Sequence, residues 1–333
     1  MHSHPLRILH CNFLNEKRVG IYYYSNNRRI SSGFIKNGHF VYEFSYREMA
    51  RSESWLGLKE FGIKRMNNKL LEAAENIQPH ILLLGHAELI HNETLNEFKK
   101  RFPNSKIVMW WVDMWHMFYR DKKNFEQRME HLDCLFTTSD PDFVKEKYEP
   151  ARRAGKVCFM PNSADASVDI GRAFERSDYL HDAIFVGRST SDRSDVISFL
   201  KSEFKDINLG LYGQNSNNML LAHKYIEVIS ATRMGINYSR HIDMPLYSSN
   251  RMIQLAANGC LVITPRTPKM EELFAKTEVV YFDGLNEMAE KIKFYIEHPE
   301  EGKKIAMAGH AKAHQTFNNK DVMAKMIDDI YTR

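Results

Sequence analysis

Short apolar runs alternate with longer amphipathic segments throughout the first half of the chain. Residues 70–77 and 94–101 have the apolar spacing of helices, whereas the shorter runs read as buried strands. The predicted strands are Arg7–His10, His39–Phe44, His80–Leu84, Lys106–Val112, Asp133–Thr137 and Val157–Met160. This alternation predicts an α/β fold with a parallel sheet covered by helices on both faces.

The same rhythm starts again after a polar, strand-free stretch at residues 161–171, which we interpret as a linker. Further strands are expected at residues 183–186, 209–212, 234–238 and 261–264. A length of 333 residues is comfortable for two domains. We therefore expect an N-terminal domain at residues 1–165 and a second domain at 172–314, with a last helix at 315–333 that packs back on the first domain.

Composition is that of an ordinary globular protein, with 43% hydrophobic and 26% charged residues. No apolar run is long enough to cross a bilayer, and the chain start leads directly into a strand rather than into a secretory signal. The four cysteines are scattered without metal-ligand spacing. These features predict a cytoplasmic protein with reduced thiols.

Charge is uneven along the chain. Residues 1–70 contain twelve Lys or Arg against five Glu and no Asp, a balance of +7, whereas the whole chain carries +4. A basic N-terminal domain suits an anionic substrate, or a peripheral contact with the inner face of an anionic membrane. A solvated basic surface is the simpler alternative. No nucleic-acid motif occurs, so nucleic acid is not an expected partner.

The most informative segment is residues 247–265, which reads as a loop, a helix, a glycine turn and a strand. Ser249 or Asn250 can cap the helix, Arg251 falls in its first turn, and Gly259 ends it at a position that favours a left-handed backbone. Free N–H groups at a helix start, next to an arginine, form a natural diphosphate site.

Arg251, Gln254, Ala257 and Gly259 fit a pattern R-x-x-[EQ]-x-x-A-x-G followed by a strand that ends in Thr-Pro. This pattern resembles the donor half of GT-B glycosyltransferases, most of all the family-4-like type (glycosyl transferases group 1) and its CgeB-like branch. The resemblance extends over residues 180–330, through the runs at 183–188, 209–213, 234–238, 287–298 and 305–309.

The resemblance implies a GT-B fold, in which two Rossmann-like parallel-sheet domains face an interdomain cleft. It also implies transfer of a sugar from a nucleoside diphosphate sugar, with UDP as the expected nucleotide, to a glycan or lipid-linked acceptor in polysaccharide biosynthesis. Retention of the anomeric configuration, without metal or other cofactor, is part of the same expectation.

Candidate donor-binding residues follow the predicted strands, where ligands of open α/β sheets bind. A glycine lets a phosphate approach the backbone, and guanidinium groups neutralise the charge on a departing diphosphate. The resemblance assigns Arg188 and Arg193 to this clamp, and two solvated surface arginines are the alternative. The remaining candidates are Gly187, Tyr212 and Gly213, together with Ser249, Asn250, Arg251 and Gln254.

Two positions depart from the family pattern. Gln254 stands where a glutamate usually grips the ribose, and Leu246 stands where a second glutamate is expected. Glutamine still offers a carbonyl acceptor but no charge. The change leaves the details of sugar binding open and slightly raises the chance of a divergent or inactive member.

On the acceptor side, the strand at 106–112 leads to Asp113 and His116 among three tryptophans. Tryptophan faces are common platforms for sugar rings, and Asp113 could orient an acceptor hydroxyl or take its proton. His86 follows another strand and is a further catalytic candidate. The alternatives are a helix cap for Asp113 and core packing for the tryptophans.

Asp140 and Asp142 form a D-x-D sequence of the kind that binds metal in other transferases. Here Pro141 follows Asp140 directly, so we interpret Asp140 as the cap of a helix that begins at Pro141. No metal site is predicted. Two alternative functions stay open: a nucleotide-sugar epimerase or hydrolase on the same fold, and a non-catalytic nucleotide-sugar-binding or coat-associated protein.

Overall fold

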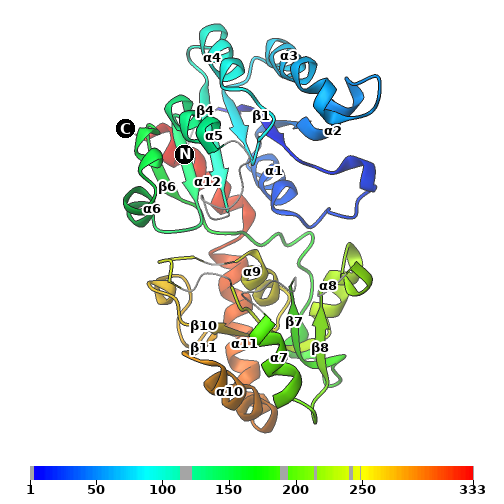
Figure 1. Ribbon diagram of the computed structural model, residues 1–333. Helices are drawn as coiled ribbons and strands as arrows, with labels where there is room; N and C mark the ends of the chain where they lie inside the picture. The colour runs from blue at the N-terminus through cyan, green and yellow to red at the C-terminus, as the bar shows by residue number, and fades with distance from the viewer. Residues whose placement is uncertain are drawn as a thin grey trace. The chain divides into compact units, whose positions relative to one another are not determined.

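The computed structural model describes residues 4–112, 122–187, 194–213, 216–239, 243–247 and 249–332. These residues form two compact units, each built on its own parallel sheet (Figure 1). Unit 1 comprises Met1–Pro161 and Asn319–Arg333, and unit 2 comprises Asn162–Asn318. The chain therefore passes from one unit to the other twice, at 161/162 and at 318/319, whereas the sequence pattern placed its boundaries at 165–172 and 314.

Unit 1 contains a parallel sheet of strand order β2-β1-β3-β4-β5-β6. Its elements are β1 (Arg7–Asn12), η1 (Glu16–Arg18), α1 (Asn26–Lys36), β2 (Phe40–Ser45), α2 (Tyr46–Ser52), α3 (Lys59–Ile77), β3 (Ile81–Leu84), α4 (Asn92–Arg101), β4 (Lys106–Trp111), α5 (Lys122–Arg128), η2 (Met129–His131), β5 (Cys134–Thr137), α6 (Pro141–Lys147), η3 (Glu149–Arg153), β6 (Val157–Phe159) and α12 (Asn319–Tyr331).

Each face of this sheet has its own buried core, because successive side chains of a strand point to opposite faces. On one face, Leu9 and Met109 pack with residues of α3 and α4. On the other, Ile8 and Val108 pack with residues of α1 and α12. Burial on both faces explains why these strands appear in the sequence as continuous apolar runs.

The last helix, α12, follows unit 2 in sequence but packs in unit 1 beside α1. Asn319 begins this helix and is buried there. Its Nδ2 donates to the Arg29 carbonyl at 3.0 Å, and its Oδ1 accepts from Lys36 Nζ at 3.0 Å. Polar contacts thus fix the start of α12 on α1, while its apolar side covers the sheet.

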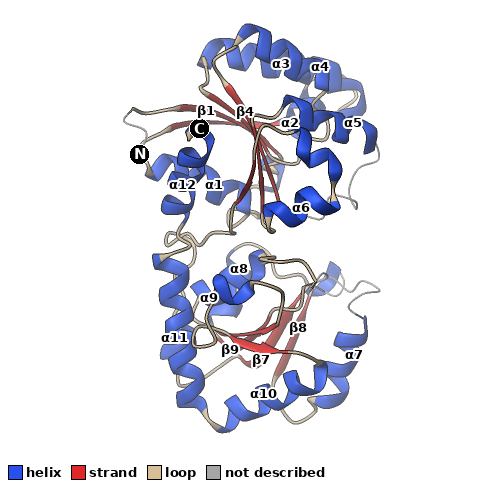
Figure 2. Cartoon of the chain, turned by 90° about the vertical axis from the view of Figure 1, so that its left-hand side faces the viewer, coloured by secondary structure: helices blue, strands red, loops and turns tan. Residues whose placement is uncertain are grey.

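Unit 2 contains a parallel sheet of strand order β11-β10-β9-β7-β8 with helices on both faces (Figure 2). Its elements are η4 (Ala173–Glu175), β7 (His181–Val186), α7 (Ser194–Glu203), β8 (Leu209–Tyr212), η6 (Ser216–Asn218), α8 (His223–Ser230), β9 (Thr232–Ile236), α9 (Asn250–Ala257), β10 (Leu261–Pro265), η7 (Met270–Glu272), β11 (Val280–Phe282), α10 (Leu285–Glu297) and α11 (Pro299–Gln315).

The turn from α9 into β10 has the geometry that the sequence predicts. Gly259 has a φ of 80°, and a Cβ at this position would lie 2.6 Å from the backbone nitrogen of Ala173. Only glycine meets both conditions without strain. The helix therefore ends where the pattern placed its end, and β10 follows directly into the core.

The predicted fold class, two parallel-sheet Rossmann-like units, is confirmed. The pattern missed several elements, among them α1, α2 and β11, which are short or rich in poor helix formers such as Asn, Ser and Gly. In the part of the chain that the structure describes, no helix combines the length and the apolar character that crossing a membrane requires.

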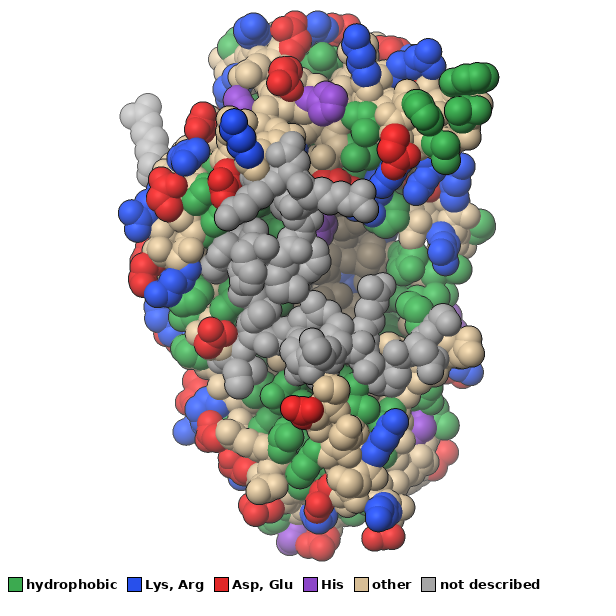
Figure 3. Space-filling view, in the orientation of Figure 1, with side chains coloured by type: hydrophobic (Ala, Val, Ile, Leu, Met, Phe, Trp, Pro, Cys, Tyr) green, Lys and Arg blue, Asp and Glu red, His purple; other side chains and the backbone are tan. Residues whose placement is uncertain are grey.

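A corner of unit 1 exposes apolar side chains at the turn between α2 and α3. Figure 3 shows hydrophobic side chains grouped at this corner, with Lys and Arg side chains next to them. The two helices cross closely, because a Cβ on Gly62 would lie 1.8 Å from the Ala50 carbonyl oxygen. The turn is therefore held by the packing of both helices.

Candidate functional site

The two sheets share one winding pattern, which locates their candidate sites. In unit 2 the chain runs outward from β7 in both directions, to β8 on one side and to β9 on the other. In unit 1 it runs outward from β1, to β2 and to β3. Ligands of such sheets bind beyond the carboxyl ends of the strands where the winding reverses. The relevant strand pairs are β7/β9 in unit 2 and β1/β3 in unit 1.

In unit 2 the first two predicted glycine turns lie against each other. The Gly187 N–H donates to the Tyr212 carbonyl at 2.9 Å. Gly213 has a φ of 79°, and a Cβ there would lie 3.2–3.3 Å from three backbone atoms of Gly187. The structure thus brings Gly187 and Gly213 together as one stretch of bare backbone beside β7 and β8.

Arg251 reaches the β7/β9 pair from the first turn of α9. Its guanidinium carbon lies 5.1 Å from the centre of the Phe185 ring on β7. Its Nη1 donates to the carbonyl of Tyr238, two residues beyond β9, at 3.2 Å. Stacking and this hydrogen bond hold a permanent positive charge at the point where the winding of unit 2 reverses.

The start of α9 differs from the expected cap. Ser249 occupies the cap position, but its side chain makes no hydrogen bond to the helix. Its hydroxyl instead donates to Asn237 Oδ1 at 2.6 Å, and Asn237 Nδ2 donates to Thr264 Oγ1 at 3.0 Å. Asn237 and Thr264 are buried at the carboxyl ends of β9 and β10. This polar chain ties the helix start to the sheet.

Asn250 is the first residue of α9. Its Oδ1 is buried and accepts no hydrogen bond from the part of the chain that the structure describes. From the sequence, Asn250 is predicted as a cap or ligand contact, and Asn237 is not singled out. The signal for Asn237 was present, since it is a polar residue near the carboxyl end of the strand predicted at residues 234–238, and the observed β9 ends just before it.

Gln254 is directed into unit 2. Its side chain is 4% exposed, and its Oε1 accepts a hydrogen bond from the Tyr225 hydroxyl at 2.8 Å. The carbonyl that was expected to face a ribose is thus bonded to α8. Leu246, the other departure from the family pattern, is also buried and has a φ of 61°.

Tyr212 extends back along the sheet. Its hydroxyl lies 2.9 Å from Nε2 of His181, the first residue of β7. This contact places the hydroxyl near the amino end of β7, away from Gly187, so the Tyr212 side chain packs along the sheet. Arg188 and Arg193, the predicted diphosphate clamp, lie outside the described residues.

In unit 1, His86 lies directly beyond the β1/β3 pair, two residues after β3. Its ring centre is 5.0 Å from that of Trp111. The loop that carries it is held by Arg128, which is almost fully buried and donates to the carbonyls of Ala87 at 2.8 Å and Ile90 at 2.6 Å. The other two acceptor-side candidates, Asp113 and His116, lie outside the described residues.

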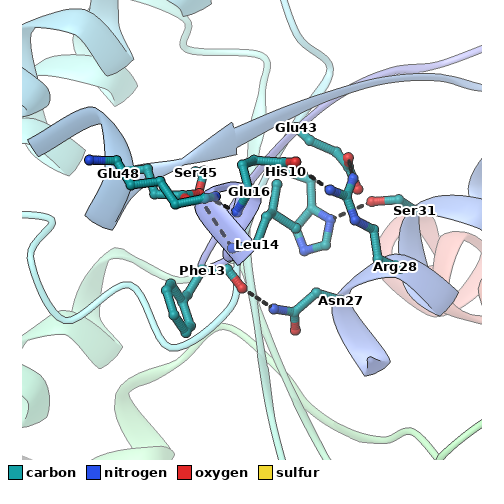
Figure 4. Close-up of polar contacts among 11 residues, drawn as sticks. His10, Phe13, Leu14, Glu16, Asn27, Arg28, Ser31, Glu43, Ser45 and Glu48 are labelled. Atoms are coloured by element: carbon teal, nitrogen blue, oxygen red, sulfur yellow. Dashed lines mark hydrogen bonds and ion pairs between the residues drawn. The ribbon is translucent and has the colours of Figure 1, made fainter. Parts of the chain in front are cut away.

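A buried polar network fills the end of β1. His10 Nδ1 lies 2.9 Å from Ser31 Oγ (Figure 4), and His10 Nε2 lies 3.2 Å from Asn12 Nδ2 and 3.4 Å from Trp110 Nε1. An indole N–H can only donate, so Nε2 is the acceptor and Nδ1 carries the proton. Burial, with a smaller contribution from Arg28, lowers the pKa of His10 to about 3, so the ring is neutral.

The loop that follows β1, residues 13–25, is fastened at its beginning to α1 and α2 (Figure 4). Glu48 accepts hydrogen bonds from the backbone N–H groups of Glu16 at 2.8 Å and Lys17 at 2.6 Å. Arg28 forms ion pairs with Glu16 and Glu43. This loop was not singled out from the sequence, and it forms the second half of the strand-end region in unit 1.

Asp140 has the structural role that the sequence predicts. Its Oδ1 accepts from the N–H groups of Asp142 at 2.9 Å and Phe143 at 3.1 Å, and Pro141 occupies the first position of α6. The interpretation as a helix start is confirmed. Asp142 points to solvent, where it pairs with Lys145 at 2.7 Å.

Comparison with known proteins agrees with this architecture. Residues 193–328 match the family model described as glycosyl transferase-like. No sequence among curated proteins matches the chain.

Solved structures resemble the chain over nearly its whole length. An α-glucosyltransferase, solved with UDP-glucose and DNA containing an abasic site, is 16% identical with a TM-score of 0.66 over 99% of this chain and 100% of its own. Sucrose-phosphate synthase from Thermosynechococcus elongatus is 13% identical with a TM-score of 0.65 over 97% and 98%. HepE from Anabaena, solved with UDP and glucose, is 10% identical with a TM-score of 0.61 over 98% and 99%.

The fold of the chain is therefore the GT-B fold, as the resemblance in the sequence predicts. The family match over residues 193–328 adds the class of enzyme, because these residues contain most of unit 2, including Gly213 and Arg251 of its candidate site. Together they define a glycosyltransferase of the GT-B class.

Proposed function

We propose that the protein transfers a sugar from UDP-sugar to a glycan or a lipid-linked acceptor, with retention of configuration and without a metal ion. The observation that carries the donor half of this proposal is Arg251, whose guanidinium lies at the β7/β9 pair in the first turn of α9. Helix N–H groups and a fixed guanidinium are suited to a diphosphate. The similar structures solved with UDP or UDP-glucose support the choice of nucleotide.

In this reaction the bond between the sugar C1 and the diphosphate oxygen breaks, and a bond from C1 to the acceptor oxygen forms on the same face. The acceptor proton passes to the departing diphosphate. Negative charge grows on the diphosphate as the bond breaks, so preorganised donors lower the barrier. Among the residues that the structure describes, Arg251 is the candidate for stabilising this negative charge. Arg188 and Arg193 are further candidates, which the sequence alone suggests.

The acceptor half rests on unit 1. We assign acceptor positioning to Asp113, with His86 and His116 as further candidates. A glycan or lipid-linked acceptor suits the basic balance of residues 1–70. We place the reaction in the cytoplasm, at the inner face of a membrane.

Arg251→Ala tests the donor assignment, with Arg233→Ala as a matched control. Arg233 is at the other end of β9, where it also lies over an aromatic ring, Tyr179 at 4.9 Å, and donates to a carbonyl, that of Ile296 at 3.5 Å. Calorimetric titration with UDP should show affinity about 10–100-fold lower for Arg251→Ala, because a charge-assisted contact is lost. Equal affinity for both variants and the unmodified chain would refute the assignment.

Incubation with UDP-glucose alone separates the three candidate functions. A transferase releases UDP slowly until an acceptor is added, a hydrolase releases it rapidly, and a binding protein releases none. Activity that disappears with EDTA and returns with Mn²⁺ would contradict the metal-independent mechanism.

Asp113→Asn tests the acceptor side. Asparagine preserves shape and loses the charge, so turnover should fall while UDP affinity stays at its original value. Normal turnover in a well-folded variant would remove Asp113 from the mechanism and leave His86 as the next residue to test.

A further inference from the structure

The corner between α2 and α3 exposes four large apolar side chains within seven residues. Trp55 is 85% exposed, Leu56 53%, Leu58 53% and Phe61 61%. Scattered single apolar residues on a surface are ordinary, but a contiguous group of this size marks a contact site.

The corner keeps these side chains outside because its backbone is fixed. The Ser54 N–H donates to the Arg51 carbonyl at 3.2 Å, and the Gly57 N–H donates to the Ser54 carbonyl at 3.0 Å. Arg65 Nη1 donates to the Glu53 carbonyl at 2.9 Å, which joins α3 to the end of α2. Together with the close helix crossing at Gly62, these bonds make a rigid, protruding turn.

Basic residues outnumber acidic residues in the segment that carries the apolar group. Residues 51–65 contain four of them, Arg51, Lys59, Lys64 and Arg65, against two acidic residues, Glu53 and Glu60. Within the described ranges, neither Lys59 nor Lys64 forms an ion pair. Lys64 and Arg65 are exposed beside Phe61 on the first turns of α3.

We propose that this corner, residues 51–65, is a docking surface for an anionic lipid bilayer. Tryptophan, leucine and phenylalanine enter the boundary between headgroups and acyl chains, while neighbouring Lys and Arg contact anionic headgroups. The excess of positive charge complements such a surface.

A second copy of the chain is a poorer occupant on the same evidence. A symmetric dimer brings the same patch of both subunits together. Pairing two such corners would therefore place their basic residues against each other, which is unfavourable.

The docking surface rests on the proposed function, because a protein that uses a lipid-linked acceptor meets this acceptor at a bilayer surface. The two are nevertheless separable. Docking involves α2 and α3 of unit 1, whereas the UDP contacts proposed above involve α9 of unit 2.

Cosedimentation of the full chain with lipid vesicles tests the docking surface. Vesicles of phosphatidylcholine with phosphatidylglycerol should bind the protein, and pure phosphatidylcholine vesicles should bind it at least tenfold more weakly. The variant Trp55→Ser/Leu58→Ser/Phe61→Ser should lose at least tenfold in binding to the anionic vesicles. In the variant Lys59→Glu/Lys64→Glu, the loss of each lysine should lower binding to the anionic vesicles about fivefold.

The matched control is Ile170→Ser/Leu180→Ser/Met307→Ser, which removes three exposed apolar side chains from unit 2 and should bind vesicles normally. UDP titration of every variant separates the two proposals. Normal UDP affinity with lost vesicle binding supports the docking surface. Vesicle binding that is absent in the original chain, or unchanged in the triple Ser variant, overturns it. A dimer in lipid-free solution that the triple Ser variant converts to a monomer also overturns it in favour of a second copy.

Discussion

In both sheets the strand order reverses beside the first strand, but the two regions at these reversal points differ in what occupies them. In unit 2, Gly187 and Gly213 leave bare backbone there, and Arg251 adds a guanidinium held by one ring and one carbonyl. In unit 1, the side chain of Asn12 occupies the space beneath Gly85, and His10 connects it to the sheet core.

This difference shows that strand winding locates a possible site but does not decide its chemistry. In unit 2 the glycine turns carry no side chain that would fill the strand ends, and the start of α9 with Arg251 adds positive charge there. In unit 1 the ring nitrogens of His10 are both used inside the network, so little hydrogen-bonding capacity is left at the strand ends themselves. On the proposed assignment of the acceptor to unit 1, the acceptor contacts come from the loops beyond the strands, such as 13–25 and the one that carries His86.

The largest change in stability is expected when a methyl group is added at Gly85, where the side chain of Asn12 already fills the space. A Cβ on Gly85 would lie 2.3–2.4 Å from three side-chain atoms of Asn12, which is fully buried. We expect Gly85→Ala to lower the free energy of unfolding of unit 1 by about 2–3 kcal/mol. UDP affinity of the folded variant should not change.

Tryptophan fluorescence during urea unfolding measures this effect selectively. All four tryptophans, at positions 55, 110, 111 and 115, belong to unit 1. If Gly85→Ala kept its stability but lost UDP affinity, the strand ends of unit 1 would have to be counted with the nucleotide site.

The sequence predicted what depends on local pattern. Buried parallel strands are continuous apolar runs, so the sheets were predictable. Asp140 before Pro141 and Gly259 after α9 are local signals, and both have the predicted geometry.

Long-range contacts could not be predicted in the same way. The hydroxyl of Ser249 bonds Asn237, twelve residues earlier on another element, instead of its own helix. Gln254 faces Tyr225 on α8, and only the packing of α8 against α9 determines that direction. Helix periodicity could place Gln254 on a face of α9 but could not show what covers that face.

A second test of the comparison uses pH, because the network of unit 1 holds a neutral histidine. Burial, with a smaller contribution from Arg28, lowers the pKa of His10 from 6.5 to about 3. Below pH 6.5, His10 is protonated in the unfolded chain but stays neutral in the folded chain. The stability of unit 1 that is present above this pH is therefore lost as the pH falls toward 3. From about pH 7 to about pH 4.5 this residue should cost about 2–3 kcal/mol of unit 1 stability.

Urea unfolding at several pH values, followed by tryptophan fluorescence, checks this slope in unit 1. His310 has a pKa lowered to about 4 mainly by burial, but it lies in unit 2 and is not detected by this signal. His10→Gln should reduce the slope even if it also lowers stability at neutral pH. An unchanged slope would mean that His10 does not titrate as described.

A smaller effect is expected for Gly213→Ala, which places a methyl group in the bare backbone of unit 2. The positive φ should cost about 1–2 kcal/mol of stability, and contact with Gly187 should lower UDP affinity about tenfold. Gly38→Ala is the matched control, because Gly38 has a φ of 81° but no atom within 4 Å of an added Cβ. Calorimetric titration should show lower affinity for Gly213→Ala alone, and equal affinities would contradict a role for this turn.

The smallest effect is expected for Tyr225→Phe, which tests whether Gln254 belongs to the candidate site or to the interior. The substitution removes the hydroxyl that donates to Gln254 Oε1 and leaves a buried carbonyl without its 2.8 Å partner. The loss should cost about 1–2 kcal/mol, measured by circular dichroism during urea unfolding, because a buried acceptor is left unpaired. UDP affinity should stay unchanged, since the contact lies between α8 and α9 inside unit 2. A variant with normal stability and weaker UDP binding would instead return Gln254 to the ribose contact expected from the family pattern.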